Sequence, residues 1–306
     1  MKHNDTPATL NLDSVDTFNK VYGFTTVHPL VSVFDMNEAT DGPVGEVAIN
    51  YGLYALMLKN GVNCTVRYGR KKCDYQEGTI VSFAPGQTVQ IDIPAERPKA
   101  HDVKGIVFHP DLIYGTSLAE KIAEFSFFDY TDTEALHLSE RERAIFLDCL
   151  DKIRLELQHD VDPHSAPLIS ANIQLMLEYL HRFYDRQFVT RHKVNSEVVA
   201  NFERSLKSWF ADRANTGKPM PTVAEFADQA ALSPGYFGEL VKRETGRNAK
   251  DIITDRMVAE AKHRLLTTDK DVATVAYELG FEYPAHFTRI FKRITGQSPT
   301  QFRAKA

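Results

Sequence analysis

The stretch Pro234-Gly235-Tyr236-Phe237-Gly238-Glu239-Leu240-Val241-Lys242-Arg243-Glu244-Thr245-Gly246 has a second copy 50 residues later in the chain. The second copy is Pro284-Ala285-His286-Phe287-Thr288-Arg289-Ile290-Phe291-Lys292-Arg293-Ile294-Thr295-Gly296. Both read P-x-x-F-x-x-[LI]-[VF]-K-R-x-T-G. Two unrelated stretches rarely agree at every apolar and basic position, so the repeat indicates one structural unit that is used twice.

Each copy has the residue spacing of a short helix. The apolar residues of each copy fall at i, i+3 and i+4, namely Phe237, Leu240 and Val241 in the first and Phe287, Ile290 and Phe291 in the second. The Pro that opens each copy pre-sets the first turn. Gly246 and Gly296 stand where a left-handed residue ends a helix. The Lys-Arg pair suits the negative end of the helix dipole. We therefore predict two short helices, each with a narrow buried face and a basic end.

The residues upstream of the two copies repeat as well. Val223-Ala224-Glu225-Phe226-Ala227 corresponds to Val272-Ala273-Thr274-Val275-Ala276, and each segment leads through a tight turn into its copy. A short helix, a tight turn and a basic second helix form a helix-turn-helix unit. Apolar residues at helical spacing from Asp251 to Leu266 predict a long helix that joins the two units.

A longer run of residues around the second copy matches a known pattern. The run is Ala261-Lys262-His263-Arg264-Leu265-Leu266, then Val272-Ala273-x-Val275-Ala276-x-x-Leu279-Gly280-Phe281, then His286-Phe287-x-Arg289-x-Phe291-Lys292-x-x-x-Gly296-x-Ser298-Pro299-x-x-Phe302-Arg303. It resembles the AraC/XylS family of bacterial transcription regulators over roughly residues 200–306. The resemblance implies a sequence-specific DNA-binding regulator whose partner is double-stranded promoter or operator DNA. RNA polymerase is a further candidate partner, and a helical bundle with no role in DNA binding is the alternative.

Charge is distributed unevenly along the chain, whose formal net charge is −5. Residues 201–306 hold 17 Lys and Arg against 13 Asp and Glu, a net charge of +4. Residues 1–200 hold 19 against 28, a net charge of −9. The two parts are therefore expected to have different partners.

The candidate DNA-contacting residues of the second copy lie outside its apolar stripe. They are Pro284, Ala285, His286, Thr288 and Arg289, with Lys292 and Arg293 further along. Arg289 is the best candidate for a bidentate contact to guanine. His286 and Thr288 are candidates for contacts to bases or phosphate, and the Lys-Arg pair for contacts to phosphate.

The first copy offers less to DNA. Its candidate residues are Gly235, Tyr236 and Glu239, with Lys242 and Arg243 as phosphate anchors. Gly235 and Gly238 have no side chain to read a base with, and Glu239 repels phosphate unless it accepts a hydrogen bond from cytosine. The alternative for Glu239 is a salt bridge to a nearby Lys or Arg. We expect the second copy to dominate direct readout.

The first half of the chain has the texture of β-strands. Short alternating or β-branched segments are separated by Gly, Pro and Asp, and the segments are 31–34, 51–58, 64–68, 79–83, 89–93 and 104–108. The stretch from Glu77 to Gln87 resembles a corner of cupin-like jelly rolls, a fold found in the sensor halves of many AraC-type regulators. We expect an α+β chain: an N-terminal antiparallel β-barrel (cupin-like jelly roll) followed by helices, then an all-α C-terminal domain.

Four regions are expected along the chain. They are a flexible N-terminal arm (1–20), a cupin-like sensor barrel (21–130), a helical dimerisation or linker region (131–195) and the DNA-binding domain (196–306). A capping-box-like Ser139-Glu140-Arg141-Glu142 starts one amphipathic helix of the third region, and a second runs from about Ala166 to Phe188. These two helices resemble the pair that carries dimerisation in AraC-type regulators, so a homodimer is expected. Helices that fold back onto the barrel would give the same pattern.

No catalytic or metal centre is expected in the barrel. Its histidines, His28, His101 and His109, lack the His-x-His pair of metal-dependent cupins, and no nucleophile elbow or phosphate loop stands in this half. We expect no enzyme activity and no cofactor. A hollow barrel would hold a small-molecule effector, whereas a packed one would serve only dimer contacts. The same regulator without a ligand, controlled by its abundance or by a partner protein, is the second hypothesis.

The remaining features indicate a cytoplasmic protein. The first residues lead into no apolar segment of a signal peptide, and no apolar run is long enough to span a membrane. Three cysteines in 306 residues do not form a disulfide framework, which fits a reducing compartment.

Overall fold

The computed structural model describes residues 8–60, 66–68, 71–73, 78–93, 102–130, 134–160, 162–190, 192–212 and 216–304. The chain divides into two compact units, Met1–Thr190 and Arg191–Ala306. None of the helices in the described ranges is both long and apolar enough to cross a membrane.

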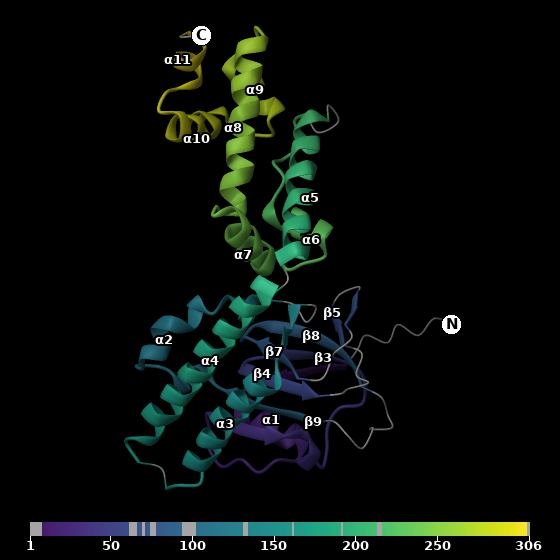
Figure 1. Ribbon diagram of the computed structural model, residues 1–306, viewed down its shortest axis with the longest axis vertical. Coiled ribbons are helices and arrows are strands. Elements are labelled where there is room, and N and C mark those ends of the chain that lie inside the picture. The colour runs from purple at the N-terminus through teal and green to yellow at the C-terminus, as the bar shows by residue number, and fades with distance from the viewer. Residues whose placement is uncertain are drawn as a thin grey trace, which may run out of the picture. The chain divides into compact units, whose positions relative to one another are not determined.

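The N-terminal unit is built on two five-stranded sheets (Figure 1). The first sheet has the order β1 (Ala8–Leu12), β3 (Gly45–Tyr51), β8 (Gln87–Ile93), β5 (Val66–Tyr68) and β6 (Lys71–Cys73). The second has the order β10 (Leu136–His137), β7 (Thr79–Phe83), β4 (Tyr54–Asn60), β9 (Asp102–Phe108) and β2 (Val31–Asp35). Sheets followed by helices and an all-helical C-terminal unit confirm the predicted α+β class. The described strands form two separate sheets.

The two sheets enclose one apolar core. It combines side chains of the first sheet with side chains of the second, for example Val47, Ile49 and Val89 with Ala55, Met57, Val81 and Val107. Tyr51 of β3 stacks on Phe83 of β7, with 4.6 Å between ring centroids and 8° between ring planes. Aromatic and β-branched side chains of the two sheets thus pack against one another, as hydrophobic burial favours.

Residues 8–20 correct the prediction of a flexible arm. They form β1 and most of helix α1 (Val15–Tyr22), and β1 pairs with β3 in parallel, in register from Ala8 opposite Val47 to Leu12 opposite Tyr51. Leu12, Val15 and Phe18 are fully buried. The β1–β3 pair is parallel, whereas the predicted barrel is antiparallel. Burial of these apolar side chains fixes the segment. Residues 1–7 lie outside the described ranges.

Gly52 separates two strands that the sequence predicts as one. β3 ends at Tyr51 and β4 begins at Tyr54, so the chain passes from one sheet to the other at this point. The Gly52 N–H donates to the Leu12 carbonyl over 3.0 Å. A Cβ at Gly52 would lie 2.9 Å from the Asp13 Cα, so the corner has no room for a side chain.

Two of the three barrel histidines have local roles in the backbone. The Nδ1 of His28 accepts the Leu30 N–H over 3.1 Å, and the Nδ1 of His109 accepts the Asp111 N–H over 3.2 Å. Burial lowers the pKa of His28. His101 lies outside the described ranges.

Helices cover the second sheet. After short helical turns at Met36–Glu38 (η1), Pro110–Leu112 (η2), Ser117–Lys121 (α2), Ile122–Glu124 (η3) and Ser126–Asp129 (η4), two long helices follow, α3 (Glu140–Glu156) and α4 (Ser165–Thr190). The predicted capping box at Ser139 is present, because its hydroxyl accepts the Glu142 N–H and the Glu142 carboxylate accepts the Ser139 N–H. The two long helices lie side by side, α3 against β2 and α4 against β10 (Figure 1).

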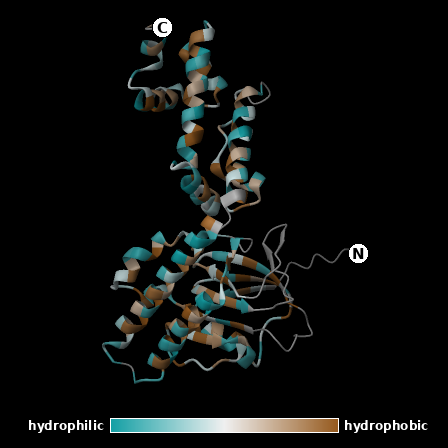
Figure 2. Ribbon diagram, viewed as in Figure 1, coloured by the Kyte–Doolittle hydropathy of each residue, from teal (hydrophilic) through white to brown (hydrophobic). Residues whose placement is uncertain are grey.

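The C-terminal unit is entirely helical. Its helices are α5 (His192–Ala211), α6 (Val223–Ala230), α7 (Pro234–Thr245), α8 (Ala249–Thr267), α9 (Val272–Glu278), α10 (Pro284–Thr295) and α11 (Pro299–Ala304). Hydrophobic and hydrophilic residues alternate along them (Figure 2). The long α8 packs against α5, α9 and α11, and buries Ile253, Met257, Val258, Ala261 and Leu265. It joins α7 to α9, as the sequence predicts.

Candidate nucleic-acid interface

The first helix-turn-helix unit consists of α6, a turn and α7. Thr222 caps α6 in a reciprocal capping box with Glu225. The Ser233 hydroxyl accepts the Tyr236 N–H over 3.2 Å and caps α7, with Pro234 at the first helical position. Ala231 ends α6 in the left-handed region with a φ of 62°. These terminators fix the turn that sets α6 against α7.

The second unit, α9 and α10, has its own terminators. The Asp271 carboxylate accepts the Thr274 N–H over 2.6 Å, and this hydrogen bond lowers the pKa of the Asp271 carboxyl. Gly280 has a φ of 80° in the turn after α9. Gly296 ends α10 with a φ of 78°, as Gly246 ends α7 with a φ of 72°, so both predicted left-handed caps are confirmed.

The two predicted apolar stripes point into the core of the unit. Phe237, Leu240 and Val241 of α7 are buried, as are Phe287 and Phe291 of α10, while Ile290 is half-buried. Phe237 meets Phe202 of α5 edge to face at 5.4 Å, and Phe287 contacts Phe281 at the same distance. The face of α10 opposite its stripe is turned to solvent, whereas Gly235, Gly238 and Glu239 on the opposite face of α7 are half-buried.

The exposed face of α10 carries most of the residues predicted to contact DNA. Ala285, His286, Arg289, Lys292 and Arg293 are exposed, and Pro284 and Thr288 are half-buried. The His286 ring meets the Phe281 ring edge to face at 5.7 Å, at the margin of this face. Among the described residues, no carboxylate lies within ion-pair distance of the three cations. Their guanidinium and ammonium groups are therefore available to an anionic partner.

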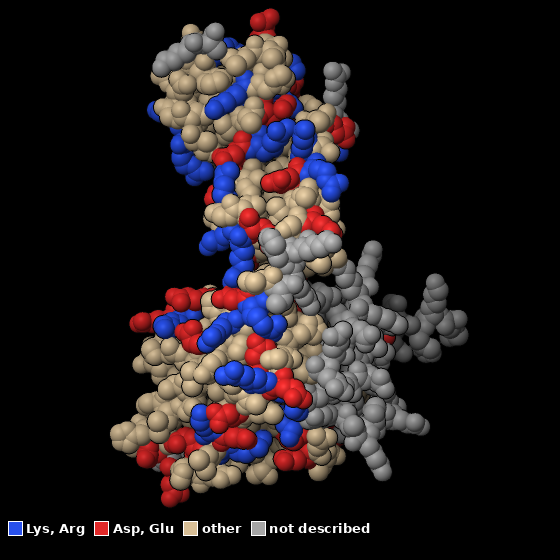
Figure 3. Space-filling model, in the orientation of Figure 1, with Lys and Arg blue, Asp and Glu red and all other residues tan. Residues whose placement is uncertain are grey.

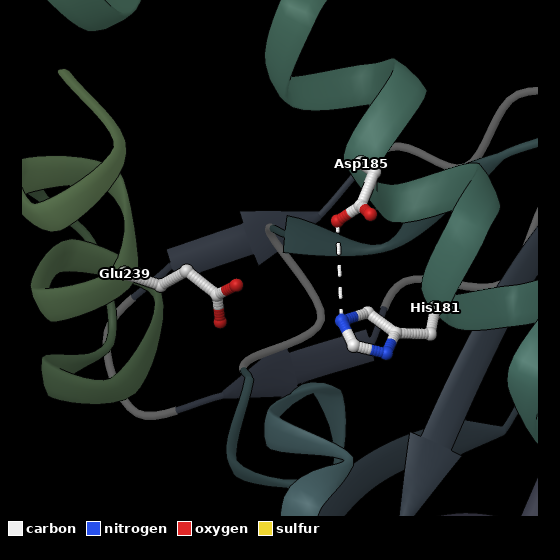
Figure 4. Close-up of side chains that lie close together, drawn as sticks. All are labelled: His181, Asp185 and Glu239. Carbon is white, nitrogen blue, oxygen red and sulfur yellow. Dashed lines mark ion pairs between the residues drawn. The ribbon is translucent and has the colours of Figure 1, made fainter.

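The corresponding face of α7 is different. Gly235 is half-buried and Lys242 is exposed. The Glu239 side chain, drawn in Figure 4, accepts hydrogen bonds at Oε1 from Arg243 Nη2 over 2.8 Å and Arg243 Nε over 3.2 Å. The salt bridge left open as an alternative for Glu239 is therefore present, and it engages one of the two predicted phosphate anchors.

Tyr236 corrects the predicted set of DNA-contacting residues. Its exposed fraction is 3%, so its side chain lies in the core and is withdrawn as a DNA contact. Position 236 lies one helical turn before Leu240, at the margin of the buried stripe, and there the tyrosine ring is turned inward. Its counterpart His286 stays exposed.

Tyr283 is a candidate that the sequence reasoning missed. Its side chain is 65% exposed directly before Pro284, at the start of α10. A tyrosine hydroxyl is a common donor to phosphate oxygens. An aromatic residue placed just before the first turn of a reading helix is the signal that would have identified it.

Charges of both signs cover the surface around these helices. Figure 3 shows Lys and Arg interspersed with Asp and Glu on the face of the C-terminal unit that it draws. Arg264 of α8 contacts Glu260 over 2.9 Å and Glu278 of α9 over 3.6 Å, and Arg247 pairs with Asp255. The cations of α10 have no carboxylate partner in the described part of the chain, and in this they differ from Arg247 and Arg264.

Comparisons with known proteins agree with this geometry. A family model described as "Helix-turn-helix domain" matches residues 226–305. The arabinose operon regulatory protein of Escherichia coli (strain K12) is 35% identical over 82 residues, which are 27% of this chain and 28% of that protein. The transcriptional activator RhaS of Yersinia pestis (strain Pestoides F) is 33% identical over 100 residues, 33% of this chain and 36% of that protein. The matches therefore span about a third or less of each relative.

A solved structure that aligns with part of the chain is the C-terminal domain of AraT, a response regulator from Geobacillus stearothermophilus. It is 22% identical, with a TM-score of 0.32, and the alignment covers 36% of this chain and 85% of that one. The family model and the curated relatives fall on the segment that holds α6 to α11. The chain thus carries, at its C-terminus, a helix-turn-helix domain of the AraC type.

Proposed function

We propose that the protein is a sequence-specific DNA-binding regulator of transcription, acting in the cytoplasm on double-stranded promoter or operator DNA. The observation that carries this proposal is the exposed face of α10. Three cations stand there without a carboxylate partner among the described residues, on a helix whose other face is locked into the core. A basic helix of this width fits the major groove.

Arg289 has the central role in this proposal. It lies in the middle of the exposed face, between Ala285 one turn before and Arg293 one turn after. A guanidinium at this place can donate two hydrogen bonds to the O6 and N7 of guanine. Lys292 and Arg293 at the end of the helix are better placed for phosphates, because they flank the reading position.

The test compares a base-reading residue with a phosphate-holding residue on the same helix. Duplexes selected from a random pool by the full-length protein define its preferred site. Arg289→Ala should then lose ~1–3 kcal/mol of binding free energy at one base pair and relax the preference there. Lys292→Ala should weaken binding to all sequences alike and reduce the dependence of log K on log salt by about one.

One result would contradict the role of Arg289, and another would contradict the proposed function. An Arg289→Ala variant that keeps the complete sequence preference of the wild type would remove Arg289 from base readout. If the wild-type chain selects no sequence from the pool at low salt, the proposed function itself fails.

We propose further that the N-terminal unit receives a small-molecule signal. Support comes from hydrogen bonds that tie α4 to the sheet edge, which we call the α4 clasp (His137, Glu142, Arg186 and Gln187). The Gln187 side-chain amide accepts the His137 N–H over 2.9 Å and donates to the Ala135 carbonyl over 3.3 Å. It thus bonds to backbone groups that a neighbouring strand would otherwise pair with. A change in β10 would thus reach the last turns of α4.

A thermal-shift screen of the full-length protein against sugars and aromatic acids tests the sensor hypothesis. A ligand of the folded state raises the melting temperature, by mass action. If no compound in these classes does so, the second hypothesis is favoured, in which the abundance of the regulator or a partner protein sets its activity.

We also propose that the protein acts as a homodimer through α3 and α4. Leu168 and Leu175 are 48% and 43% exposed and seven residues apart, which places them on one face of α4. Further along α4, His181 Nε2 lies 3.9 Å from Asp185 Oδ1 (Figure 4). Leu155 of α3 is 59% exposed. Exposed leucines on a helix pair are typical of a contact between protein chains.

A further inference from the structure

The two recognition-type helices differ in net charge although their sequences repeat. Residues 234–245 contain two Lys or Arg and two Glu, a net charge of zero. Residues 284–295 contain three Lys or Arg and no carboxylate, a net charge of +3. The helices keep the same buried stripe and the same C-terminal glycine caps, and two of the three charges by which they differ come from one pair of positions opposite that stripe.

The largest single difference is at one pair of equivalent positions. Glu239 of α7 corresponds to Arg289 of α10 at the offset of 50 residues. Both lie at the centre of the face opposite the buried stripe, because both stand two residues after the core Phe and two before the core residue Val241 or Phe291. A base-reading cation in one helix is thus replaced by an anion in the other.

Glu239 also engages the cation one turn along α7. Its Oε1 accepts from both Nη2 and Nε of Arg243, and the two side chains are 22% and 34% exposed. Two hydrogen bonds to one carboxylate oxygen draw the guanidinium back along the helix. In α10, by contrast, the equivalent residues Arg289 and Arg293 are both cations.

We propose that Glu239 lowers the affinity of the first helix-turn-helix unit for the DNA backbone, so that discrimination between sequences is left to α10. This inference rests on the proposed DNA-binding function. Non-specific binding comes almost entirely from cations that displace counterions from phosphates. A neutral α7 therefore reduces binding to every sequence, whereas the base contacts of α10 favour the preferred sequence only.

A competing role for Glu239 is direct readout of cytosine, whose N4 amino group donates in the major groove. The contacts with Arg243 favour attenuation, because the carboxylate oxygen that accepts both bonds is directed toward the next turn of its own helix. The two roles predict opposite effects of removing the charge, since a reader loses affinity when it is neutralised.

The test is Glu239→Gln in the full-length protein, with Glu244→Gln as the matched control. Gln keeps the size of the side chain and removes the charge. Glu244 is on the same helix, and its Oε2 accepts from the Ser196 hydroxyl over 3.0 Å. Glu244→Gln therefore removes an equal charge from α7 at a position away from Glu239. Equal melting temperatures of the variants and the wild type establish that the folded state is intact.

The measurement is binding to a random-sequence duplex and to the selected duplex over a range of salt concentrations. Glu239→Gln should bind the random duplex several-fold more tightly, and one additional phosphate contact should steepen the slope of log K against log salt by about 0.9. The ratio of selected to random affinity should fall. Glu244→Gln should leave the slope unchanged.

Two results would overturn the proposal. Loss of preference at one C·G pair in Glu239→Gln, without a steeper salt slope, would make Glu239 a base-reading residue. Unchanged binding to both duplexes would mean that α7 stays away from DNA. In both cases, sequence-selective binding by the wild type and a relaxed preference at one base pair in Arg289→Ala would leave the proposed function standing.

Discussion

Single residues with left-handed backbones set the turns of the two helix-turn-helix units. Gly280 has a φ of 80°, and a Cβ built on it would lie 1.9 Å from the Lys218 carbonyl oxygen. Ala231 ends α6 at a φ of 62° and is the one non-glycine residue with a positive φ among those described. The first turn therefore stores strain that the second turn avoids.

Substitutions at these turns should change the free energy of unfolding in opposite directions. Gly280→Ala should lower it by more than the ~1–2 kcal/mol that a left-handed alanine costs, because the methyl group also meets the Lys218 carbonyl. Ala231→Gly should raise it by ~0.5–1 kcal/mol, since the relief of strain exceeds the added entropy of the unfolded chain. Urea unfolding of the full-length variants measures both.

Gly246→Ala is the control for the contact with the Lys218 carbonyl. Gly246 has a φ of 72°, and a Cβ on it would meet nothing within 4 Å. This variant should therefore lose only the free energy that a left-handed alanine backbone costs. Equal losses in Gly246→Ala and Gly280→Ala would show that the close approach at Gly280 contributes nothing.

Residue spacing predicted which side of each recognition-type helix is buried, and it did not predict the width of the buried side. The stripe of Phe237, Leu240 and Val241 is correct, yet Tyr236 is buried as well. A tyrosine at the margin of a stripe can turn its ring inward or outward, and the neighbouring helices decide which. The Glu239–Arg243 pair, in contrast, follows from i, i+4 spacing alone.

Among the elements, β1 is one of those that were not predicted from the sequence. It pairs with β3 at a separation of 39 residues, for example Leu10 opposite Ile49, and only that pairing makes a strand of this short segment. By comparison α3, α4 and α8 could be predicted well, because a stripe over several turns and a capping signal are properties of the local sequence.

The α4 clasp joins three elements at one ion pair. Arg186 of α4 donates from Nε to Glu142 of α3 over 2.8 Å, and from Nη2 to the His137 carbonyl of β10 over 2.7 Å. Burial opposes the ionisation of Glu142, but hydrogen bonds from Ser139 and the Arg186 guanidinium outweigh it and lower the pKa of the Glu142 carboxyl. The clasp therefore depends on an ionised Glu142.

Stability of the N-terminal unit should accordingly carry a pH dependence that Glu142→Gln removes. A carboxyl with a lowered folded-state pKa stabilises the fold fully above its unfolded pKa of about 4.3, and the stabilisation is lost as the pH falls through the folded pKa. At pH 7 the free energy of unfolding of the variant should be ~1–3 kcal/mol lower than that of the wild type. The difference should shrink steadily below about pH 4.

Glu140→Gln is the matched control, since Glu140 is an exposed residue in the same first turn of α3. It should lose little stability at pH 7. A constant gap between Glu142→Gln and the wild type from pH 7 down to pH 2 would contradict the ionic clasp and indicate a packing defect.

At the scale of the whole molecule, the chain combines an acidic and a basic part. Residues 1–200 carry a net charge of −9 and residues 201–306 a net charge of +4. The acidic part is repelled by DNA and leaves the contact to the helix-turn-helix units. A single basic helix offers few base contacts, so two copies of the chain on adjacent half-sites would raise both affinity and specificity.

The dimer proposed through α3 and α4 is tested by placing charge on their exposed leucines. The double variant Leu168→Lys and Leu175→Lys should sediment as a monomer at concentrations where the wild type is a dimer. The substitutions should change the stability of each folded protomer little, because surface substitutions usually alter stability by less than about 0.5 kcal/mol. Its affinity for a duplex with two half-sites should fall toward that for a single half-site.

Leu266→Lys is the control, because Leu266 is 50% exposed on α8 in the C-terminal unit and lies outside the proposed contact. This variant should remain dimeric. A wild-type chain that stays monomeric at all concentrations would rule out the dimer. A double variant that stays dimeric would show that the dimer forms through another surface. The exposed leucines of α4 would then need a different partner, because exposure of a row of apolar side chains to water is unfavourable.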